Sequence, residues 1–269
     1  MNLKDRVAVI TGAGGGIGRA TALSLARRGC HLALADIDEA GLVETHAQAL
    51  RLSVRASKHL LDVADRAAVA ALPAEVLQSH HGVDLLVNNA GVALGGHFDQ
   101  VSETDFDWLM EINFHAVVRM TRAFLPVLRA SDDARIVNIS SVFGLISPPG
   151  QSAYSASKFA VRGFSNALRY ELAGSRVGVS VVHPGGVATA IARNARVSAD
   201  TSAEEKHRRL ALAEKLLRLP PEEAGEIIVR GVEKRRARIL VGRDAVFIAL
   251  IERLFPVNYW RVLGRGIQS

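Results

Sequence analysis

The sequence is poor in the features that mark secreted and membrane proteins. Its 269 residues include one cysteine, Cys30, which excludes an intrachain disulfide and fits a reducing cytosol. No run of about eighteen apolar residues occurs, so we expect no membrane-spanning helix. Residues 1–6 lead directly into a short apolar run, without the pattern of a signal peptide. These absences predict a cytoplasmic protein.

The charge of the chain is unevenly distributed. Acidic and basic residues cancel up to Ala192, so the whole formal net charge of +6 comes from the residues that follow. Those basic residues alternate with Glu and Leu, which is typical of solvated helix faces. We therefore expect no nucleic-acid partner, and the sequence gives no reason to expect a metal site.

Short apolar runs rich in branched residues recur along the chain and predict strands buried on both faces. We expect seven strands, at residues 7–10, 31–35, 54–61, 83–87, 136–139, 177–182 and 238–242. Helical patterns lie between them, at residues 20–29, 39–52, 67–78 with an interruption at Pro73, 103–129, 159–172 and 221–236. This alternation predicts an α/β fold with a doubly wound parallel sheet of seven strands.

We expect the chain to form a single domain in three parts. Residues 1–192 form the core, residues 193–242 add helices and the last strand, and residues 243–269 form an apolar and basic C-terminal tail. The tail could be a helical lid over an apolar substrate, an oligomer contact or an interfacial helix on a membrane. Of these roles, peripheral membrane contact is the least favoured.

A glycine-rich turn at residues 11–18, Thr-Gly-Ala-Gly-Gly-Gly-Ile-Gly, separates the first strand from the first helix. Glycines let backbone N–H groups approach a pyrophosphate, and a helix N-terminus adds positive potential. Asp36 stands 18 residues after Gly18, near the distance expected for a carboxylate that binds the adenosine ribose and repels a 2′-phosphate. The turn therefore predicts NAD in preference to NADP, although Asp36 could instead cap the next helix.

Polar residues also follow later strands. Asn88, Asn89 and Gly91 lie where the fourth strand ends, either lining a ligand crevice or forming a simple turn. Asn113 lies inside the predicted helix 103–129, where asparagine is mildly unfavourable. Its side chain is therefore expected to hold a water or a backbone group.

Tyr154 and Lys158 are four residues apart at the start of a helical pattern, so they share one helix face. A free tyrosine has a pKa near ~10, whereas an acid/base group works best with a pKa near ambient pH. One cation at about 4 Å supplies on the order of 4 kcal/mol, enough to lower that pKa by about 3 units. The pair is thus a candidate proton-transfer group, although the same spacing is common on surface helices.

Four motifs together make the chain resemble the short-chain dehydrogenase/reductase family over about residues 3–191. They are the glycine turn, the Asn-Asn-Ala-Gly run at residues 88–91, Tyr154-x-x-x-Lys158 and Pro184-Gly185. The resemblance implies a Rossmann-type sheet, NAD as cofactor, a small-molecule alcohol or ketone as substrate, and a homotetramer or dimer.

The resemblance also implies roles for individual residues. Tyr154 would be the catalytic acid/base, and Lys158 would lower its pKa and contact the nicotinamide ribose. Ser141, thirteen residues earlier, would polarise the substrate oxygen, with Ser140 as the competing candidate, and Asn113 would hold the water of a proton relay. The residues implied in cofactor binding are Gly12, Gly16, Ile17, Gly18, Asp36, Asp62, Val63, Asn89, Ala90, Gly91, Tyr154, Lys158, Pro184, Gly185, Val187 and Thr189.

The sequence as a whole predicts an NAD-dependent oxidoreductase that interconverts a secondary alcohol and a ketone, with a lipophilic substrate. Two alternatives stay open. A dehydratase or epimerase on the same scaffold would accumulate no reduced cofactor, and a sensor would bind NAD without turnover.

Overall fold

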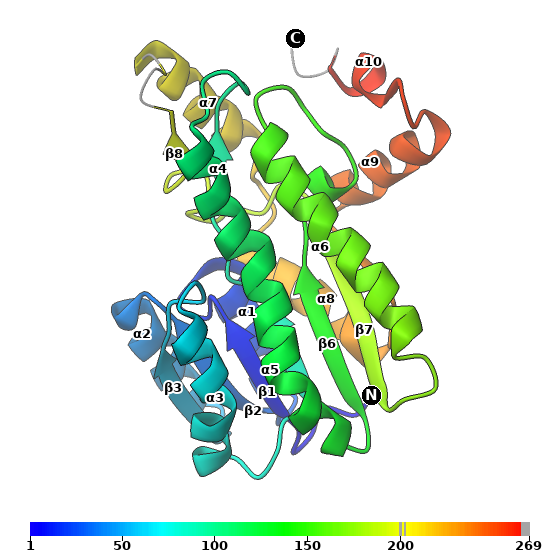
Figure 1. Ribbon diagram of the computed structural model, residues 1–269. Helices are drawn as coiled ribbons and strands as arrows, with labels where there is room; N and C mark the ends of the chain where they lie inside the picture. Colours follow the sequence, from blue (N-terminus) through cyan, green and yellow to red (C-terminus); the bar gives the residue numbers. More distant parts are fainter. Residues whose placement is uncertain (199–200, 202, 265–269) are drawn as a thin grey trace.

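A parallel sheet of seven strands runs through the middle of the molecule (Figure 1). The computed structural model describes residues 1–198, 201 and 203–264. In spatial order the strands are β3 (Ala56–Leu60), β2 (His31–Asp36), β1 (Val7–Thr11), β4 (Leu85–Asn88), β6 (Ala134–Ile139), β7 (Val177–Pro184) and β9 (Arg238–Val241). The predicted doubly wound sheet of seven strands is therefore confirmed. Its order reverses between β1 and β4, and ligands of such sheets bind beyond the carboxyl ends of the strands at this point.

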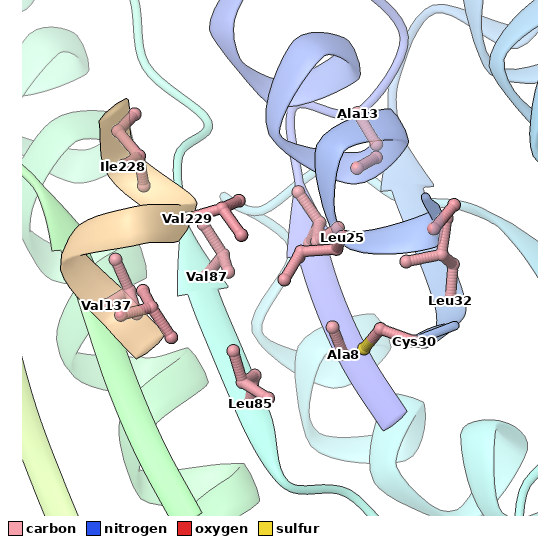
Figure 2. Close-up of a cluster of buried hydrophobic side chains, with 14 of the residues drawn as sticks. Ala8, Ala13, Leu25, Cys30, Leu32, Leu85, Val87, Val137, Ile228 and Val229 are labelled. Carbon is pink, nitrogen blue, oxygen red and sulfur yellow. The ribbon is translucent and has the colours of Figure 1, made fainter. Parts of the chain in front are cut away.

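Helices cover both faces of the sheet, as the continuous apolar strands require. One face packs against α1 (Gly16–Ala26), α2 (Glu39–Leu50) and α8 (Pro221–Glu233). The other packs against α3 (Arg66–Ser79), α5 (Ala116–Ala130) and α6 (Ser152–Glu171). In the first layer Leu25 and Val229 lie near Val87 of β4, and Cys30 is buried next to Ala8 as a free thiol (Figure 2).

Two predicted helices differ from expectation. The helix expected to break at Pro73 is continuous, because Val69, Leu72 and Val76 are buried against the sheet on both sides of the proline. The helix predicted at residues 103–129 consists of α4 (Glu103–Met110), a π-helical turn (Glu111–His115) and α5. Such turns shift the helix register by one residue and often occur at functional sites.

The C-terminal third contains elements that lie outside the main sheet. A small second sheet, which the sequence did not predict, pairs β5 (Leu94–Gly95) with β8 (Arg196–Val197). The helices α7 (Ala203–Leu216), α9 (Arg243–Leu254) and α10 (Tyr259–Leu263) gather at the end of the molecule to which the labelled strand arrows point (Figure 1). Within the described residues, no helix is both long and apolar enough to cross a membrane.

Candidate active site

The Tyr154–Lys158 pair lies in the first turns of α6, which packs against β7 and the π-helical turn. The Lys158 side chain reaches the carboxyl end of β6, since its ammonium donates a hydrogen bond to the carbonyl of Ile139 at 3.2 Å. The Lys158 Nζ atom lies 5.6 Å from the centre of the Tyr154 ring. The predicted helix therefore brings a buried ammonium beside a phenol.

Burial controls the protonation of this pair. It lowers the pKa of Lys158 to about 8 and raises the pKa of Tyr154 to about 12, because a low-dielectric site disfavours both charged forms. A hydrogen bond from Ser141 acts in the opposite direction on Tyr154 and lowers its pKa. Burial outweighs this hydrogen bond, so the pKa of Tyr154 lies above its usual value, and the expectation that Lys158 lowers it stays a prediction.

The two candidate serines have different environments. Ser140 is buried, and its hydroxyl donates to the backbone carbonyl of Lys158 at 2.9 Å, which holds α6 against β6. The Ser141 hydroxyl is hydrogen-bonded to Tyr154 and accepts from the backbone N–H of Phe143 at 3.1 Å. It thereby caps a short 3-10 turn, Val142–Gly144. Only the second of these serines reaches the phenol, as the sequence spacing had favoured.

Asn113 lies in the π-helical turn and is buried. Its amide oxygen accepts from the backbone N–H of Val92 at 2.8 Å, and its amide nitrogen donates to the Val92 carbonyl at 3.0 Å and to the Ser157 hydroxyl at 3.1 Å. A Cβ on Gly91 would lie 3.1 Å from the Asn113 oxygen and 3.5 Å from Lys158 Nζ. The side chain thus holds a backbone group, and it joins the loop after β4 to α6.

The glycine turn between β1 and α1 is shaped by close backbone contacts. Gly12 and Gly16 have left-handed φ values of +65° and +51°, and a Cβ on Gly18 would overlap the carbonyl oxygen of Gly12. The Asn89 amide donates to the carbonyls of Thr11 and Gly12 at 2.9 and 3.1 Å. The Asn-Asn-Ala-Gly run therefore holds the glycine turn in place and is more than a simple turn.

Asp36 lies against the glycine turn. Its carboxylate accepts from the backbone N–H of Gly14 at 2.6 Å and from that of Asp38 at 2.9 Å. The cap of α2 is Asp38, whose carboxylate accepts from Gly41 N. Arg19, a residue just beyond the turn that sequence reasoning passed over, pairs with Glu44 at 2.7 Å. Asp38, and not Asp36, is therefore the N-cap of α2, and the Asp36 carboxylate lies beside the glycine turn.

The remaining sequence-predicted cofactor residues occupy two loops. Asp62 and Val63 follow β3, where the Asp62 carboxylate accepts from Ala64 N at 2.8 Å and Val63 is buried. Pro184 ends β7, and Gly185 N donates to the carbonyl of Val241 in β9 at 2.9 Å. Val187 and Thr189 lie in the loop that follows Pro184 and Gly185, and Val187 is buried. Ile17, in the glycine turn, and Ala90, after β4, each pack against one of the two hydrophobic cores.

Thr189 connects the loop after β7 to the glycine turn. Its methyl carbon lies 3.1 Å from the position of a Cβ on Gly16. The loop after β7 therefore reaches back over the glycine turn. His183, which the sequence analysis did not single out, is buried next to this loop and its Nδ1 contacts the Ser141 carbonyl at 2.9 Å. A histidine that ends an apolar strand is a weak signal, since its ring is more often a core residue.

The C-terminal tail also reaches the site. The Tyr259 hydroxyl in α10 accepts a hydrogen bond at 3.1 Å from Ser147 N, in the loop that precedes α6. Among the described residues, no group of three or more His, Cys, Asp or Glu side chains is arranged to bind a metal ion.

A doubly wound parallel sheet with a glycine turn at its carboxyl edge defines the class of Rossmann-type dinucleotide-binding proteins. The comparisons with known proteins place the chain within this class. The family model described as short chain dehydrogenase matches residues 6–200. The chain therefore belongs to the short-chain dehydrogenase/reductase family, and it is an oxidoreductase of that family.

Similar proteins span nearly the whole chain. The oxidoreductase SadH of Mycobacterium tuberculosis is 46% identical over 99% of this chain and 96% of its own length. A short-chain dehydrogenase/reductase from Burkholderia phymatum, solved in complex with NAD, is 31% identical, with a TM-score of 0.87 over 94% of this chain and 95% of that one. A short chain dehydrogenase from Mycobacterium paratuberculosis, also bound to NAD, is 26% identical, with a TM-score of 0.78 over 90% and 97%.

Proposed function

We propose that the protein is an NAD-dependent oxidoreductase that interconverts a secondary alcohol and a ketone. The observation that carries this proposal is the Tyr154 hydroxyl, which is hydrogen-bonded to Ser141 and lies one helical turn from Lys158. Two hydroxyls that converge at the carboxyl edge of the sheet suit the recognition of one substrate oxygen. Membership of a family of oxidoreductases supports the same reaction class.

In the proposed mechanism Ser141 and Tyr154 hold the substrate oxygen, and Tyr154 moves its proton. During alcohol oxidation the Tyr154 oxygen accepts the hydroxyl proton, and during ketone reduction it returns a proton to the forming alkoxide. The Lys158 ammonium stabilises the phenolate form of Tyr154. When bound, the nicotinamide cofactor would supply the hydride chemistry, with NAD as the acceptor in alcohol oxidation and NADH as the donor in ketone reduction. Asn113 keeps the catalytic helix in register with the loop after β4.

The residues at the carboxyl edge of the sheet fit a dinucleotide. The glycine turn leads into the N-terminus of α1, where free backbone N–H groups favour an anion, and a Cβ on Gly15 would meet open space. In the proposal Gly12, Gly16, Ile17 and Gly18 hold the pyrophosphate. Asp36 holds the adenosine ribose and Asp62 and Val63 the adenine. Asn89, Ala90 and Gly91 line the remainder, and the nicotinamide end is lined by Pro184, Gly185, Val187 and Thr189.

The proposed preference for NAD rests on charge. The Asp36 carboxylate would repel a 2′-phosphate, at a cost of a few kcal/mol at about 4 Å. The guanidinium of Arg19 could have offset that repulsion, but it is paired with Glu44 and donates to Gly41 O at 3.2 Å. The NAD bound in the Burkholderia and Mycobacterium structures is a further argument for this cofactor.

We propose a lipophilic substrate, because apolar side chains are exposed at the end of the molecule above the site. In α7, α9, α10 and the segment between the last two, the exposed large apolar residues are Leu210, Leu212, Leu216, Val246, Phe247, Leu250, Leu254, Phe255, Val257 and Val262. The contact between Tyr259 and Ser147 connects this surface to the loop before the catalytic helix. A lid over an apolar substrate is thus the favoured role of the tail.

The decisive experiment compares Tyr154→Phe with Tyr170→Phe, a substitution on the exposed part of the same helix. Purified protein is given NAD or NADP with a panel of small, cyclic, steroidal and long-chain secondary alcohols, and reduced cofactor is measured. We expect wild type and Tyr170→Phe to turn over with NAD on one substrate class. Tyr154→Phe should lose turnover and still bind NADH, because only the proton-transfer group is removed.

Other outcomes would reject parts of the proposal. Turnover by Tyr154→Phe at the wild-type rate would remove the acid/base role, and turnover with NADP alone would overturn the argument from Asp36. Substrate conversion without net NADH formation would favour the dehydratase or epimerase alternative.

A further inference from the structure

The loop after β7, residues 184–189, is held from two sides. On one side the Gly186 carbonyl accepts from the backbone N–H groups of Arg218 and Leu219, both at 2.9 Å. Ala188 N in turn donates to the Leu219 carbonyl at 2.9 Å. Arg218 and Leu219 belong to the segment that follows α7, so this segment holds the loop through backbone hydrogen bonds.

On the other side the loop is held by one side chain from the C-terminal tail. Asp244, the second residue of α9, accepts a hydrogen bond from Gly186 N at 2.6 Å. A Cβ on either Gly185 or Gly242 would overlap the Asp244 carboxylate. Gly242 also has a left-handed φ of +99°, which permits the sharp turn from β9 into α9. Two glycines thus make room for this carboxylate against the loop.

Asp244 fixes the direction of the Gly186 amide, and the backbone that follows leads to the candidate cofactor residues. Val187 is buried and forms a parallel bridge with Leu219, and Thr189 lies over Gly16 of the glycine turn. A rotation of the peptide before Gly186 would displace both of them. The carboxylate therefore acts on this end of the site through the loop and not by contact with a substrate.

We propose that Asp244 is a positioning residue for the nicotinamide end of the cofactor site. This inference rests on the proposed function, in which residues 184–189 line that end. It gives the C-terminal tail a second role beside that of a lid, because α9 holds the cofactor loop while α10 contacts Ser147 in the loop before the catalytic helix. The tail, the cofactor loop and the catalytic helix are then mechanically connected.

The test compares binding of NADH with binding of ADP-ribose, which lacks the nicotinamide. In Asp244→Ala we expect NADH affinity and kcat each to fall about tenfold, the effect of losing one hydrogen bond to a charged group. Affinity for ADP-ribose should stay within about twofold, because the glycine turn and Asp36 are untouched. Asp244→Asn keeps an acceptor oxygen and should remain within about threefold of wild type in all three measurements.

Two further variants separate positioning from helix stability. Arg243→Ala changes the preceding, exposed residue of α9 and should behave like wild type. Asp244→Glu keeps the negative charge near the helix N-terminus, which favours α9, but moves the carboxylate by one methylene. It should show the same selective loss of NADH affinity as Asp244→Ala, and it serves as the test if the alanine variant does not fold.

Each remaining result would overturn the inference. Equal losses of NADH and ADP-ribose affinity would mean that Asp244 supports the fold as a whole. Wild-type values in Asp244→Ala and Asp244→Glu would mean that the loop does not depend on the carboxylate. If wild type itself binds no NADH, the proposed function fails and the inference fails with it. If wild type binds NADH and turns over, the proposed function stands, and the Asp244 variants then test the positioning role alone.

Discussion

The two ends of the candidate site are built in different ways. At the glycine turn the polar groups are paired within the chain: Asn89 donates to the Thr11 and Gly12 carbonyls, and Asp36 accepts from Gly14 N. At the candidate catalytic centre, by contrast, desolvation shifts the pKa of Tyr154 upward and that of Lys158 downward, so that the neutral form of each side chain is favoured. One end is organised by shape and the other by charge.

This difference predicts how each end responds to substitution. Where close backbone contacts define the structure, an added methyl group costs stability and binding together, since the close-packed turn cannot relax. Where buried charge defines it, removal of a polar group can leave the fold intact or even stabilise it, because the desolvation penalty disappears with the group. Stability and activity should therefore change together at the glycine turn and separately at the catalytic centre.

The largest effect is expected at the glycine turn, from Gly18→Ala. Its Cβ would overlap the Gly12 carbonyl oxygen, so the turn must open and α1 must shift. We expect NADH binding to weaken more than about 100-fold and the protein to lose at least about 1–3 kcal/mol of stability. Isothermal titration calorimetry and thermal unfolding measure both.

The matched control for this substitution is Gly15→Ala, three residues earlier in the same turn. A Cβ there meets no atom within 4 Å, and the backbone is extended, with φ −166°. The Tm of Gly15→Ala should therefore remain within a few degrees of wild type. Equal destabilisation by the two substitutions would contradict the view that shape organises this end.

The next largest effect separates the two serines at the catalytic centre. Ser141→Ala removes the hydroxyl bonded to Tyr154 and should lower kcat by about 10²–10³, the usual effect of losing a donor to the reacting oxygen. Ser140→Ala removes the hydrogen bond from its hydroxyl to the Lys158 carbonyl, which should cost about 0.5–1.5 kcal/mol of stability and change kcat less than about tenfold. Steady-state kinetics and thermal unfolding of both variants test this. A reversal of the two patterns would exchange their roles.

The fold could be predicted from the sequence because its signals are local and repeated. Continuous branched runs such as residues 7–10 require burial on both faces, and seven of them separated by helices leave few arrangements besides a doubly wound sheet. The two-residue strands β5 and β8 carry no such pattern. Neither does the π-helical turn at Asn113, since a register shift of one residue leaves the helical spacing of apolar residues nearly unchanged.

The site was predictable where spacing along the chain determines proximity, and unpredictable where distant segments meet. Tyr154 and Lys158 share a helix, so their separation follows from geometry. The choice between Asp36 and Asp38 as the helix cap required the structure, because both precede α2. Asp244 lies 58 residues from the amide it holds and gave no signal in the sequence at all.

The last prediction concerns the pH dependence of stability at this end and comes from Lys158→Met. The folded-state pKa of Lys158 is about 8, below the usual lysine value of 10.5, so the folded protein binds fewer protons than the unfolded chain between these values. Stability therefore rises with pH across this window, and the penalty for the buried charge is fully present only below about pH 8. Replacing the ammonium by a thioether of similar length should stabilise the protein by up to about 3 kcal/mol at pH 7.

This gain should shrink toward zero by about pH 10.5, where lysine is neutral in the unfolded chain as well, while turnover is lost at every pH. Urea unfolding of wild type and variant at several pH values from 6 to 10.5 measures the difference. Lys58→Met, at an exposed position on β3, should change stability by less than about 0.5 kcal/mol at each pH. A Lys158→Met variant that is less stable than wild type at pH 7 would mean that the hydrogen bond to Ile139 outweighs the desolvation of the ammonium, and charge would then support the fold at this end as well.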